Sequence, residues 1–444
     1  MNYSQAVAFL DGYINYEKLP DFRWTQAAFR LDRMFRMLEL LDNPHKTYPS
    51  LHVAGTKGKG STCAFAASML QAHGKKTGLY ISPHVLDLRE RVSIDGRWIS
   101  ENEFSSAMTA LRPVIEQVEK EMIPTTYFEI LTALAMWHFA REKIDLAVFE
   151  VGIGGRLDAT NVVTPVVSVI ATIGFDHMDK LGNTLSAIAQ EKCGIVKPGV
   201  PVVSAPQQPE ALKTIERICR ERGCSLKLVG RDIRVLAEPG RGFKFETDTG
   251  IYETDRLGIE GIHQRENAAC ALGALEEAQR AGLVQLDDIL VSKGLSSASL
   301  RARFEIIPGE PTILLDGAHN ADSLRSLVDS LKERPDLAGR KTVAVVGLAA
   351  DKDLHACLKI LSEIADEFVF TRTSNPRAAK PQDLLQTLQD VSSKPGRVID
   401  CIEAAFRAGI ESAGKEGLAV VTGSFYLAGD VASVIIKEAE ASGS

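Results

Sequence analysis

The sequence predicts an α/β protein in which a mainly parallel, P-loop-type sheet domain with a small β-rich insert precedes a smaller, Rossmann-like α/β domain. Three observations predict this class. An apolar strand runs into a glycine-rich turn and a helix at residues 51–61, further strands alternate with helical segments to about Pro201, and five strands separated by helices follow between residues 312 and 422. We expect the first domain to span residues 1–300 and the second to span residues 301–444.

The stretch Leu51–Ser61 has the composition of a phosphate-binding loop. Glycine lacks a Cβ and can adopt positive φ, so successive backbone N–H groups can converge on an anion, and the start of a helix adds its positive dipole end. Lys59 supplies a mobile cation, although the spacing departs from the standard Walker pattern. An ordinary glycine turn is the alternative, but it leaves two lysines and a hydroxyl residue unexplained. The candidate nucleotide-binding residues are Gly55, Thr56, Lys57, Gly58, Lys59, Gly60 and Ser61.

Composition and charge exclude several classes of protein. The 444 residues are 45% hydrophobic and 25% charged, which is typical of a soluble globular protein of two or three domains. A formal net charge of −7 gives no electrostatic reason to expect binding to nucleic acid or to an anionic membrane. The seven cysteines are scattered without metal-type spacing, which indicates reduced thiols. With no leader-like or membrane-spanning segment expected, the predicted location is cytoplasmic.

Hydrophobic periodicity gives the expected elements in chain order. Residues 4–41 follow a helical pattern interrupted near Pro20, with one apolar face that contains Phe29, Leu31, Met34, Phe35 and Leu38. In the rest of the first domain we expect helices at residues 61–72, 101–121, 127–141, 184–196, 263–272 and 286–296, strands at 76–81, 145–151 and 166–173, and a β-rich insert at 225–255. The second domain should contain strands at residues 312–315, 342–347, 367–371, 397–400 and 418–422.

Polar side chains follow several of these strands directly. Ser82, Glu150 and His177 each come after a predicted strand of the first domain, where ligands of parallel sheets usually bind. A lone histidine in a loop is more often structural than a ligand, but a carboxylate and a hydroxyl in the same position favour a Mg²⁺ site beside the nucleotide. Lys192, which follows Glu191 on a predicted helix, is by default half of a solvated charge pair.

Taken in order, these motifs resemble the folylpolyglutamate synthase and dihydrofolate synthase family, a branch of the Mur ligase superfamily. The resemblance covers nearly the whole chain, and its one clear departure is Lys57, where the family usually has asparagine. It rests on residues 55–61, Ser82-Pro83-His84, residues 126–129 and 150–161, Asp176-His177, Glu191-Lys192, His263-Gln264 with Asn267, Arg303, and residues 316–320.

The resemblance implies an ATP-dependent amide ligase that joins L-glutamate to dihydropteroate or to reduced folates through an acyl phosphate. It implies two Mg²⁺ sites, leaves room for K⁺, and favours a monomer. Besides the loop, the residues implied to bind the nucleotide are Asn267, Arg303 and Asp316, and the implied metal ligands are Ser61, Ser82, Glu150, His177 and a carbamylated Lys192. The implied catalytic residues are Lys59, Lys192, His177 and His319. The residues implied to bind the pterin are Thr126, Tyr127, Phe128, Glu129, Asp158, Ala159 and Thr160.

Several alternatives remain open at this point. A P-loop kinase or transport ATPase leaves the second sheet unexplained, and a nicotinamide-dependent oxidoreductase is only loosely suggested by residues 152–155. Within the ligase reading we favour a bifunctional enzyme over one that only extends polyglutamate tails. Phe128 could be a core residue, Asp158 could cap a turn, and Lys192 could be an unmodified surface lysine paired with Glu191.

Overall fold

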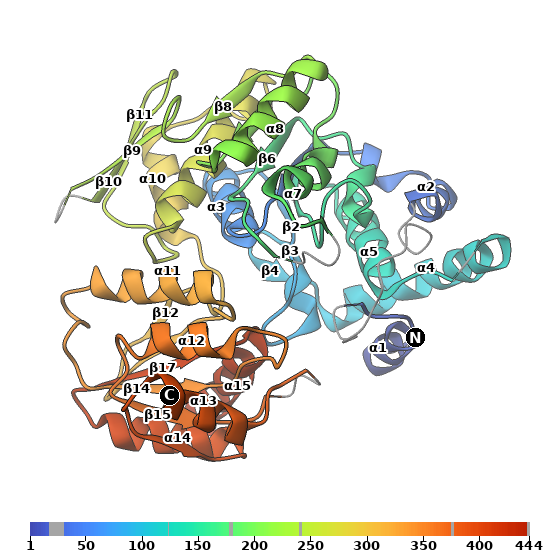
Figure 1. Ribbon diagram of the computed structural model, residues 1–444. Coiled ribbons are helices and arrows are strands. Elements are labelled where there is room, and N and C mark those ends of the chain that lie inside the picture. Colours follow the sequence, from blue (N-terminus) through green and yellow to red (C-terminus); the bar gives the residue numbers. More distant parts are fainter. Residues whose placement is uncertain (17–30, 123, 177–180, 239–241, 374–376, 442–444) are drawn as a thin grey trace. The chain divides into compact units, whose positions relative to one another are not determined.

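The computed structural model describes residues 1–16, 31–122, 124–176, 181–238, 242–373 and 377–441. The described chain forms two compact units (Figure 1). The first unit contains Met1–His84, Leu88–Gly258 and Gln264–Ser299, and the second contains Val85–Asp87, Ile259–His263 and Leu300–Ser444.

The helices and strands of the first unit alternate along most of its length. Its helices are α1 (Tyr3–Asp11), α2 (Leu31–Leu40), α3 (Lys59–Ala72), α4 (Glu101–Glu121), α5 (Tyr127–Arg141), α7 (Leu185–Lys192), α8 (Pro209–Glu221), α9 (Gln264–Arg280) and α10 (Asp288–Ser297). Its strands are β1 (Ser50–Ala54), β2 (Thr77–Tyr80), β3 (Val92–Ile94), β4 (Arg97–Trp98), β5 (Leu146–Glu150), β6 (Val167–Ile170), β7 (Val202–Ser204), β8 (Leu226–Leu228), β9 (Arg234–Glu238), β10 (Gly242–Glu246) and β11 (Ile251–Thr254).

An eight-stranded sheet in the order β4-β3-β2-β5-β1-β6-β7-β8 forms the centre of the first unit. The pairs from β2 to β8 are parallel, whereas β3 and β4 add antiparallel pairs at one edge. Strand β1 lies between β5 and β6, so the carboxyl ends of all three strands meet at the same edge. This geometry brings the residues after β1 close to Glu150, the last residue of β5.

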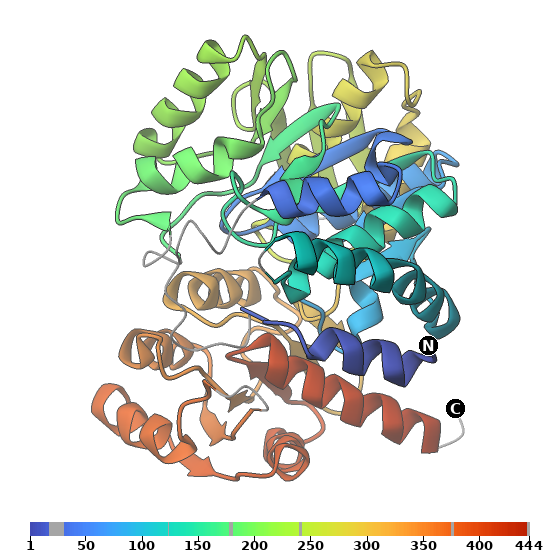
Figure 2. The same ribbon diagram turned by 90° about the vertical axis from the view of Figure 1, so that its right-hand side faces the viewer.

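Helices cover both faces of this sheet. On β7, Val202 belongs to an apolar cluster with residues of α7 and α8. The neighbouring Val203 points to the opposite face, where it lies against Gly273 of α9, because a Cβ added to that glycine would be 3.1 Å from Val203 Cγ1. Helices α3, α9 and α10 pack together, and α4 and α5, drawn in teal in Figure 2, lie side by side.

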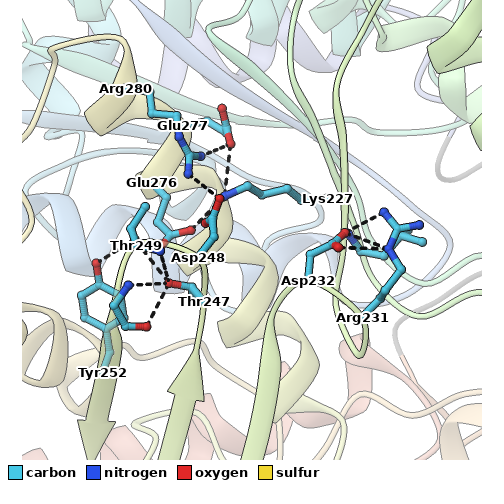
Figure 3. Close-up of polar contacts among 12 residues, drawn as sticks. Lys227, Arg231, Asp232, Thr247, Asp248, Thr249, Tyr252, Glu276, Glu277 and Arg280 are labelled. Atoms are coloured by element: carbon cyan, nitrogen blue, oxygen red, sulfur yellow. Dashed lines mark hydrogen bonds and ion pairs between the residues drawn. The ribbon is translucent and has the colours of Figure 1, made fainter.

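Strands β9, β10 and β11 form a separate antiparallel sheet, the insert. A buried carboxylate joins it to α9: Glu276, whose side chain is fully buried, accepts hydrogen bonds from the hydroxyls of Thr247 and Thr249 and forms an ion pair with Lys227 at 3.2 Å (Figure 3). Lys227 Nζ also lies 2.7 Å from Asp248. The polar network therefore fixes the position of the insert on α9.

The second unit contains one six-stranded sheet with helices between its strands. Its strands are β12 (Glu305–Ile307), β13 (Thr312–Leu315), β14 (Thr342–Val346), β15 (Glu367–Phe370), β16 (Gly396–Val398) and β17 (Leu418–Thr422), and its helices are α11 (Ala321–Lys332), α12 (Leu354–Leu361), α13 (Pro381–Val391), α14 (Ile402–Ala413) and α15 (Phe425–Ala441). The order is β12-β13-β17-β14-β15-β16, and every pair is parallel except β12 with β13.

The predicted fold class is confirmed, with small corrections to its elements. The five strands expected in the second sheet are present, but the antiparallel β12 was not expected, because its three residues are too short to give a period of two. Helix α3 begins at Lys59 rather than Ser61, and α7 ends at Lys192 rather than residue 196. The expected apolar face of α2 is partly wrong: Met34 and Leu38 are buried, but Phe35 is 49% exposed, and Phe29 lies outside the described residues.

The expectations for the cysteines and for membrane-spanning helices can be compared directly with the structure. All seven cysteines are free, as expected for reduced thiols. Within the described residues, no helix is both long enough and apolar enough to cross a membrane.

Candidate active site

The candidate phosphate loop, residues 55–61, begins at the end of β1 and passes into α3. Gly58 has a φ of 81° and is the N-cap of α3, whereas Gly55 and Gly60 do not have positive φ. Gly55 is instead required by packing, because a Cβ there would lie 2.8 Å from the Cβ of Ala171. Of the three glycines, Gly58 alone uses the left-handed backbone, and it makes the turn into the helix.

Part of the loop is tied to the strand beside it. The backbone N–H groups of Thr56 and Lys57 both donate to Thr172 O, at 2.9 and 3.1 Å. The hydroxyl of Thr56 also exchanges hydrogen bonds with the backbone of Gly174. Since these groups hold the loop, the amides suited to an anion are those of residues 59–61, which begin α3 and have no carbonyl four residues earlier within the helix.

Asn267 lies against the turn. A Cβ added to Gly58 would be 2.2 Å from Asn267 Oδ1, so the amide side chain occupies the space beside the glycine. Asn267 Nδ2 donates to Gln264 Oε1 at 2.8 Å, and both residues are buried. Gln264 therefore sets the orientation of the Asn267 amide.

Glu150 connects three elements at the same edge of the sheet. Its Oε2 accepts the backbone N–H of Ser82 at 2.9 Å, and its Oε1 lies 4.0 Å from Lys59 Nζ. The carboxylate is nearly fully buried. The structure thus places Ser82, Glu150 and Lys59 together, while His177 lies outside the described residues.

The residues present fit a hard cation that keeps nucleotide oxygens or water among its ligands. Ser61, in the first turn of α3, and Ser82 carry hydroxyl oxygens, and Glu150 carries a carboxylate, which are ligands that Mg²⁺ prefers. In the described part of the chain, no group of three His, Cys, Asp or Glu side chains could hold a metal by itself.

Lys192 is buried in the same region. Its Nζ donates to Gly55 O at 2.8 Å, and only 4% of the residue is exposed. Burial, followed by the nearby charge of Lys59, lowers the pKa of Lys192 to about 7. Glu191 pairs instead with Arg156 at 3.0 Å. The alternative of a surface lysine paired with Glu191 is therefore wrong.

Two residues expected to bind pterin have clear structural roles at the start of α5. Thr126 and Glu129 form a reciprocal capping box, in which each side chain accepts the other's backbone N–H. Glu129 also forms a buried ion pair with Arg33 at 2.8 Å. Burial raises the pKa of Glu129, and the charge of Arg33 and its hydrogen bond oppose that shift.

Tyr127 and Phe128 present aromatic rings from the same turn. Tyr127 is buried, with the guanidinium of Arg91 5.9 Å from its ring centroid. Phe128 is only partly buried, and its ring lies directly against Gly152, where an added Cβ would be 2.6 Å from Cζ. Phe128 is thus held on one side by the loop after β5 and is not wholly enclosed.

Asp158 and Thr160 lie in this loop, with Ala159 buried between them. The Asp158 carboxylate accepts hydrogen bonds from the backbone N–H groups of Gly152, Ile153 and Thr160 and from the Thr160 hydroxyl. Asp158 therefore does cap a turn, and its carboxylate faces into the loop.

The carboxyl edge of the second sheet carries the remaining candidates. Asp316 accepts the backbone N–H groups of Phe304 and Ala318, at 2.7 and 2.8 Å. The Arg303 guanidinium lies 4.1 Å from the ring centroid of Phe425, and the His319 ring is 5.9 Å from the same ring. Within the second unit, the structure brings Arg303 and His319 together at Phe425, a residue to which the sequence assigned no role.

Three further residues hold site residues, and the sequence assigned none of them a role. Gln264 belongs to the motif His263-Gln264 with Asn267, and its position three residues before Asn267 on one helix was the available signal for their contact. Arg33 and His52 contact residues about one hundred positions away, and no local pattern signals such pairs.

Two family models match the chain in the order of its two units. The Mur ligase middle domain matches residues 53–275, and the Mur ligase glutamate ligase domain matches residues 302–425. The dihydrofolate synthase/folylpolyglutamate synthase of Bacillus subtilis (strain 168) is 36% identical over 440 residues, which cover 97% of this chain and 98% of that protein. The chain belongs to the folylpolyglutamate synthase/dihydrofolate synthase family of Mur ligases.

Other members agree in sequence and in fold. The folylpolyglutamate synthase of Lacticaseibacillus casei is 32% identical over 98% of this chain and 99% of its own. A Mycobacterium tuberculosis folylpolyglutamate synthase complexed with ADP and AMPPCP has a TM-score of 0.87 at 28% identity, covering 97% of this chain and 98% of that one. An E. coli FolC in complex with DHPP and ADP has a TM-score of 0.85 at 29% identity, covering 99% and 98%. Family membership excludes the kinase, transport ATPase and oxidoreductase alternatives.

Proposed function

We propose that the protein is an ATP-dependent carboxylate–amine ligase that adds L-glutamate to dihydropteroate and to the glutamate tail of reduced folates. The observation that carries the proposal is the start of α3, where the amides of residues 59–61 and the Lys59 ammonium lie beside the buried carboxylate of Glu150. This arrangement supports phosphoryl transfer. The similarity to folate-type glutamate ligases along nearly the whole chain supports the choice of substrates.

The proposed reaction has two steps. A carboxylate oxygen of the pterin acid attacks the γ-phosphorus of ATP, an acyl phosphate forms, and the bond to the β–γ bridging oxygen breaks to release ADP. The neutral amine of L-glutamate then attacks the acyl carbon, and an amide, inorganic phosphate and one proton are the products. The first step depends mainly on positioning and charge neutralisation, which Lys59 and the amides of α3 supply.

We propose that Ser61, Ser82 and Glu150 hold Mg²⁺ on the phosphates, together with His177. Bound Mg²⁺ would neutralise charge on the phosphates during transfer. A second Mg²⁺ site and a K⁺ site complete the proposed cofactors.

Lys192 is proposed to be carbamylated. The buried Nζ beside Gly55 O has no room for the bulk hydration that a lysine ammonium normally keeps. Reaction of the neutral amine with CO₂ forms an N–C bond, releases one proton and leaves an anionic carbamate. That anion would be able to bind the metal or to orient the incoming amine.

Both units contribute residues with proposed roles in binding or catalysis. In the first unit, Phe128 is the best-placed residue to contact the pterin ring, and the residues around it, Thr126, Tyr127, Glu129 and 158–160, are proposed to shape its pocket. Asn267 is proposed to bind the nucleotide. In the second unit, Arg303 and Asp316 are also proposed to bind the nucleotide, with His319 as a catalytic residue. We further propose a monomeric, cytoplasmic enzyme, in line with its seven free cysteines.

The proposal is tested with purified protein, Mg²⁺-ATP and L-glutamate, offered dihydropteroate or tetrahydrofolate in parallel. We expect ADP release with both acids, strictly dependent on glutamate, and a loss of about 100-fold in kcat for Lys59→Met, which removes the cation but keeps the chain. Turnover of tetrahydrofolate alone would leave polyglutamylation as the only activity. Turnover of neither acid would contradict the proposal.

A further inference from the structure

A chain of buried hydrogen bonds joins β1 to the loop that follows β5. His52, in the middle of β1, is fully buried, and its Nε2 lies 2.8 Å from the hydroxyl of Thr160. That hydroxyl lies 2.5 Å from Asp158 Oδ1. The three side chains therefore form one continuous path, although His52 and Thr160 are 108 residues apart in the sequence.

The direction of these hydrogen bonds follows from the partners of Asp158. Three of them are backbone N–H groups, of Gly152, Ile153 and Thr160, at 3.0–3.1 Å, so the carboxylate acts as an acceptor throughout. The Thr160 hydroxyl then donates its proton to Asp158, and its oxygen accepts from His52. His52 consequently carries a proton on Nε2.

The surroundings of the other ring nitrogen, Nδ1, support this assignment of the proton. His52 Nδ1 is buried and lacks a hydrogen-bond partner. An unpaired lone pair costs less than an unpaired N–H of an imidazolium would, and burial lowers the pKa of His52 to about 3. The ring is therefore neutral at any pH at which the enzyme would work.

The path ends at Phe128. Asp158 Oδ2 holds the N–H groups of Gly152 and Ile153. Gly152 in turn is the surface against which the ring of Phe128 lies, since an added Cβ would meet Cζ at 2.6 Å. A shift of Asp158 would thus move Gly152, which supports the Phe128 ring. The Asp158 carboxylate itself faces into the loop, and the residue is only 6% exposed.

We propose that His52 and Thr160 are positioning residues that, through Asp158, fix the loop supporting Phe128 and so set the affinity for the pterin substrate without touching it. The inference rests on the proposed function, because it takes Phe128 as a pterin contact. Its consequence is that the strand leading into the phosphate loop also orders the pterin pocket. A misplacement of about 1 Å at such a support is enough to cost substantial activity.

The matched test compares Thr160→Val with Thr160→Ser. Valine has nearly the same shape but cannot carry the two hydrogen bonds, whereas serine keeps the hydroxyl. We expect Thr160→Val to weaken dihydropteroate binding, measured by fluorescence titration, at least tenfold, with ADP affinity within twofold of the unmodified protein. Thr160→Ser should stay within threefold for both ligands. As a control, Thr214→Val removes a buried hydroxyl on α8, outside the path, and should change neither affinity.

Direct binding separates this inference from the proposed function. If the unmodified protein does not bind dihydropteroate, the proposed addition of glutamate to dihydropteroate is wrong. If it binds, and Thr160→Val and Thr160→Ser bind equally well, the positioning role is wrong.

A second measurement needs no variant. Nitrogen NMR of ¹⁵N-histidine-labelled full-length protein, assigned with His52→Gln, should show His52 protonated on Nε2 and unprotonated on Nδ1. A resonance pair showing the proton on Nδ1, or on both nitrogens, at pH 7 would overturn the proposed direction of the path.

Discussion

At the residue scale, the phosphate loop depends on two glycines for different reasons. Gly58 needs its positive φ and also leaves room for Asn267, whereas Gly55 allows β1 to approach Ala171 of the neighbouring chain segment. A larger residue should therefore destabilise the loop by different mechanisms at the two positions: backbone strain at Gly58 and overpacking at Gly55.

Gly58→Ala should separate nucleotide affinity from stability. The substitution costs about 1 kcal/mol of left-handed backbone strain, and its Cβ forces the Asn267 amide away from the turn. We expect at least a tenfold loss of ADP affinity by titration calorimetry. Gly74→Ala, after α3, is the matched control: its φ is 73° but a Cβ there meets nothing within 4 Å. It should lower the free energy of unfolding similarly and leave ADP affinity unchanged; equal ADP affinity in both variants would refute the steric argument.

Lys192→Ala should abolish the amide-forming step if the carbamate is functional. The alanine variant removes the anion, and added short-chain carboxylates should restore part of the activity because they can occupy the space left beside Gly55. Steady-state assays with and without acetate or propionate measure this. Full activity of Lys192→Ala without any added acid would show that Lys192 has no such role.

His52 should make the folded state sensitive to acid. Its pKa is about 3 in the folded protein and 6.5 ordinarily, so between these values only the unfolded chain binds the proton. The free energy of unfolding therefore falls as the pH falls, by about 2 kcal/mol between pH 7.5 and pH 5 from this group. In His52→Gln, urea denaturation should show a pH dependence smaller by that amount.

The unmodified protein is the reference for this prediction. An equal pH dependence in His52→Gln and in the unmodified protein would show that folding does not lower the pKa of His52.

At the element scale, polar residues at the ends of helices and strands fix the loops that carry the candidate site. The capping box of α5 orients Phe128, and the Asp158 turn orients the loop after β5. Thr56 and Lys57 hold the phosphate loop against the end of β6. Hydrogen bonds of the protein itself thus set the conformation of each loop.

Glu276→Ala should loosen the insert. Removing one partner of a buried ion pair costs about 3 kcal/mol, because Lys227 and two threonine hydroxyls lose their shared acceptor. Amide hydrogen exchange should accelerate mainly in β9–β11. Glu116→Ala breaks an exposed pair with Arg112 on α4, and should change stability by less than about 0.5 kcal/mol. Uniformly faster exchange, with no preference for the insert, would argue against the anchoring role.

At the scale of the whole molecule, the described chain packs around cores that belong to separate units. One set of apolar clusters contains residues of the first unit, and another contains residues of the second. Proteins built in this way often unfold in more than one step.

Calorimetry should therefore show a calorimetric enthalpy of unfolding larger than the van 't Hoff enthalpy. Mg²⁺-ADP at about 100 times its dissociation constant should stabilise the nucleotide-binding part by about 2.7 kcal/mol, which raises at least one transition. A single transition with equal enthalpies, with and without nucleotide, would show that the chain unfolds as one cooperative unit.

The sequence by itself determined the class of fold, the order of most elements and the place of the glycine-rich loop between β1 and α3. These depend on local signals: a strand followed by glycines and a helix start, one strand followed by Ser82 and another ending in Glu150, and helical periodicity in residues 101–121 and 127–141. Local signals are strong where burial on a regular element dictates the pattern of residues. The antiparallel β12 and the exposed Phe35 were missed because neither has such a pattern.

Only the tertiary structure decided which polar groups pair with one another. Lys192 reaches Gly55 across 137 residues, Arg33 reaches Glu129 across 96, and His52 reaches Thr160 across 108. Such pairs form because a buried polar group must find a partner wherever the chain brings one close, and sequence spacing does not encode that distance. The sequence left Lys192 as either a surface lysine or a residue at the metal site, and the structure shows a buried amine beside Gly55.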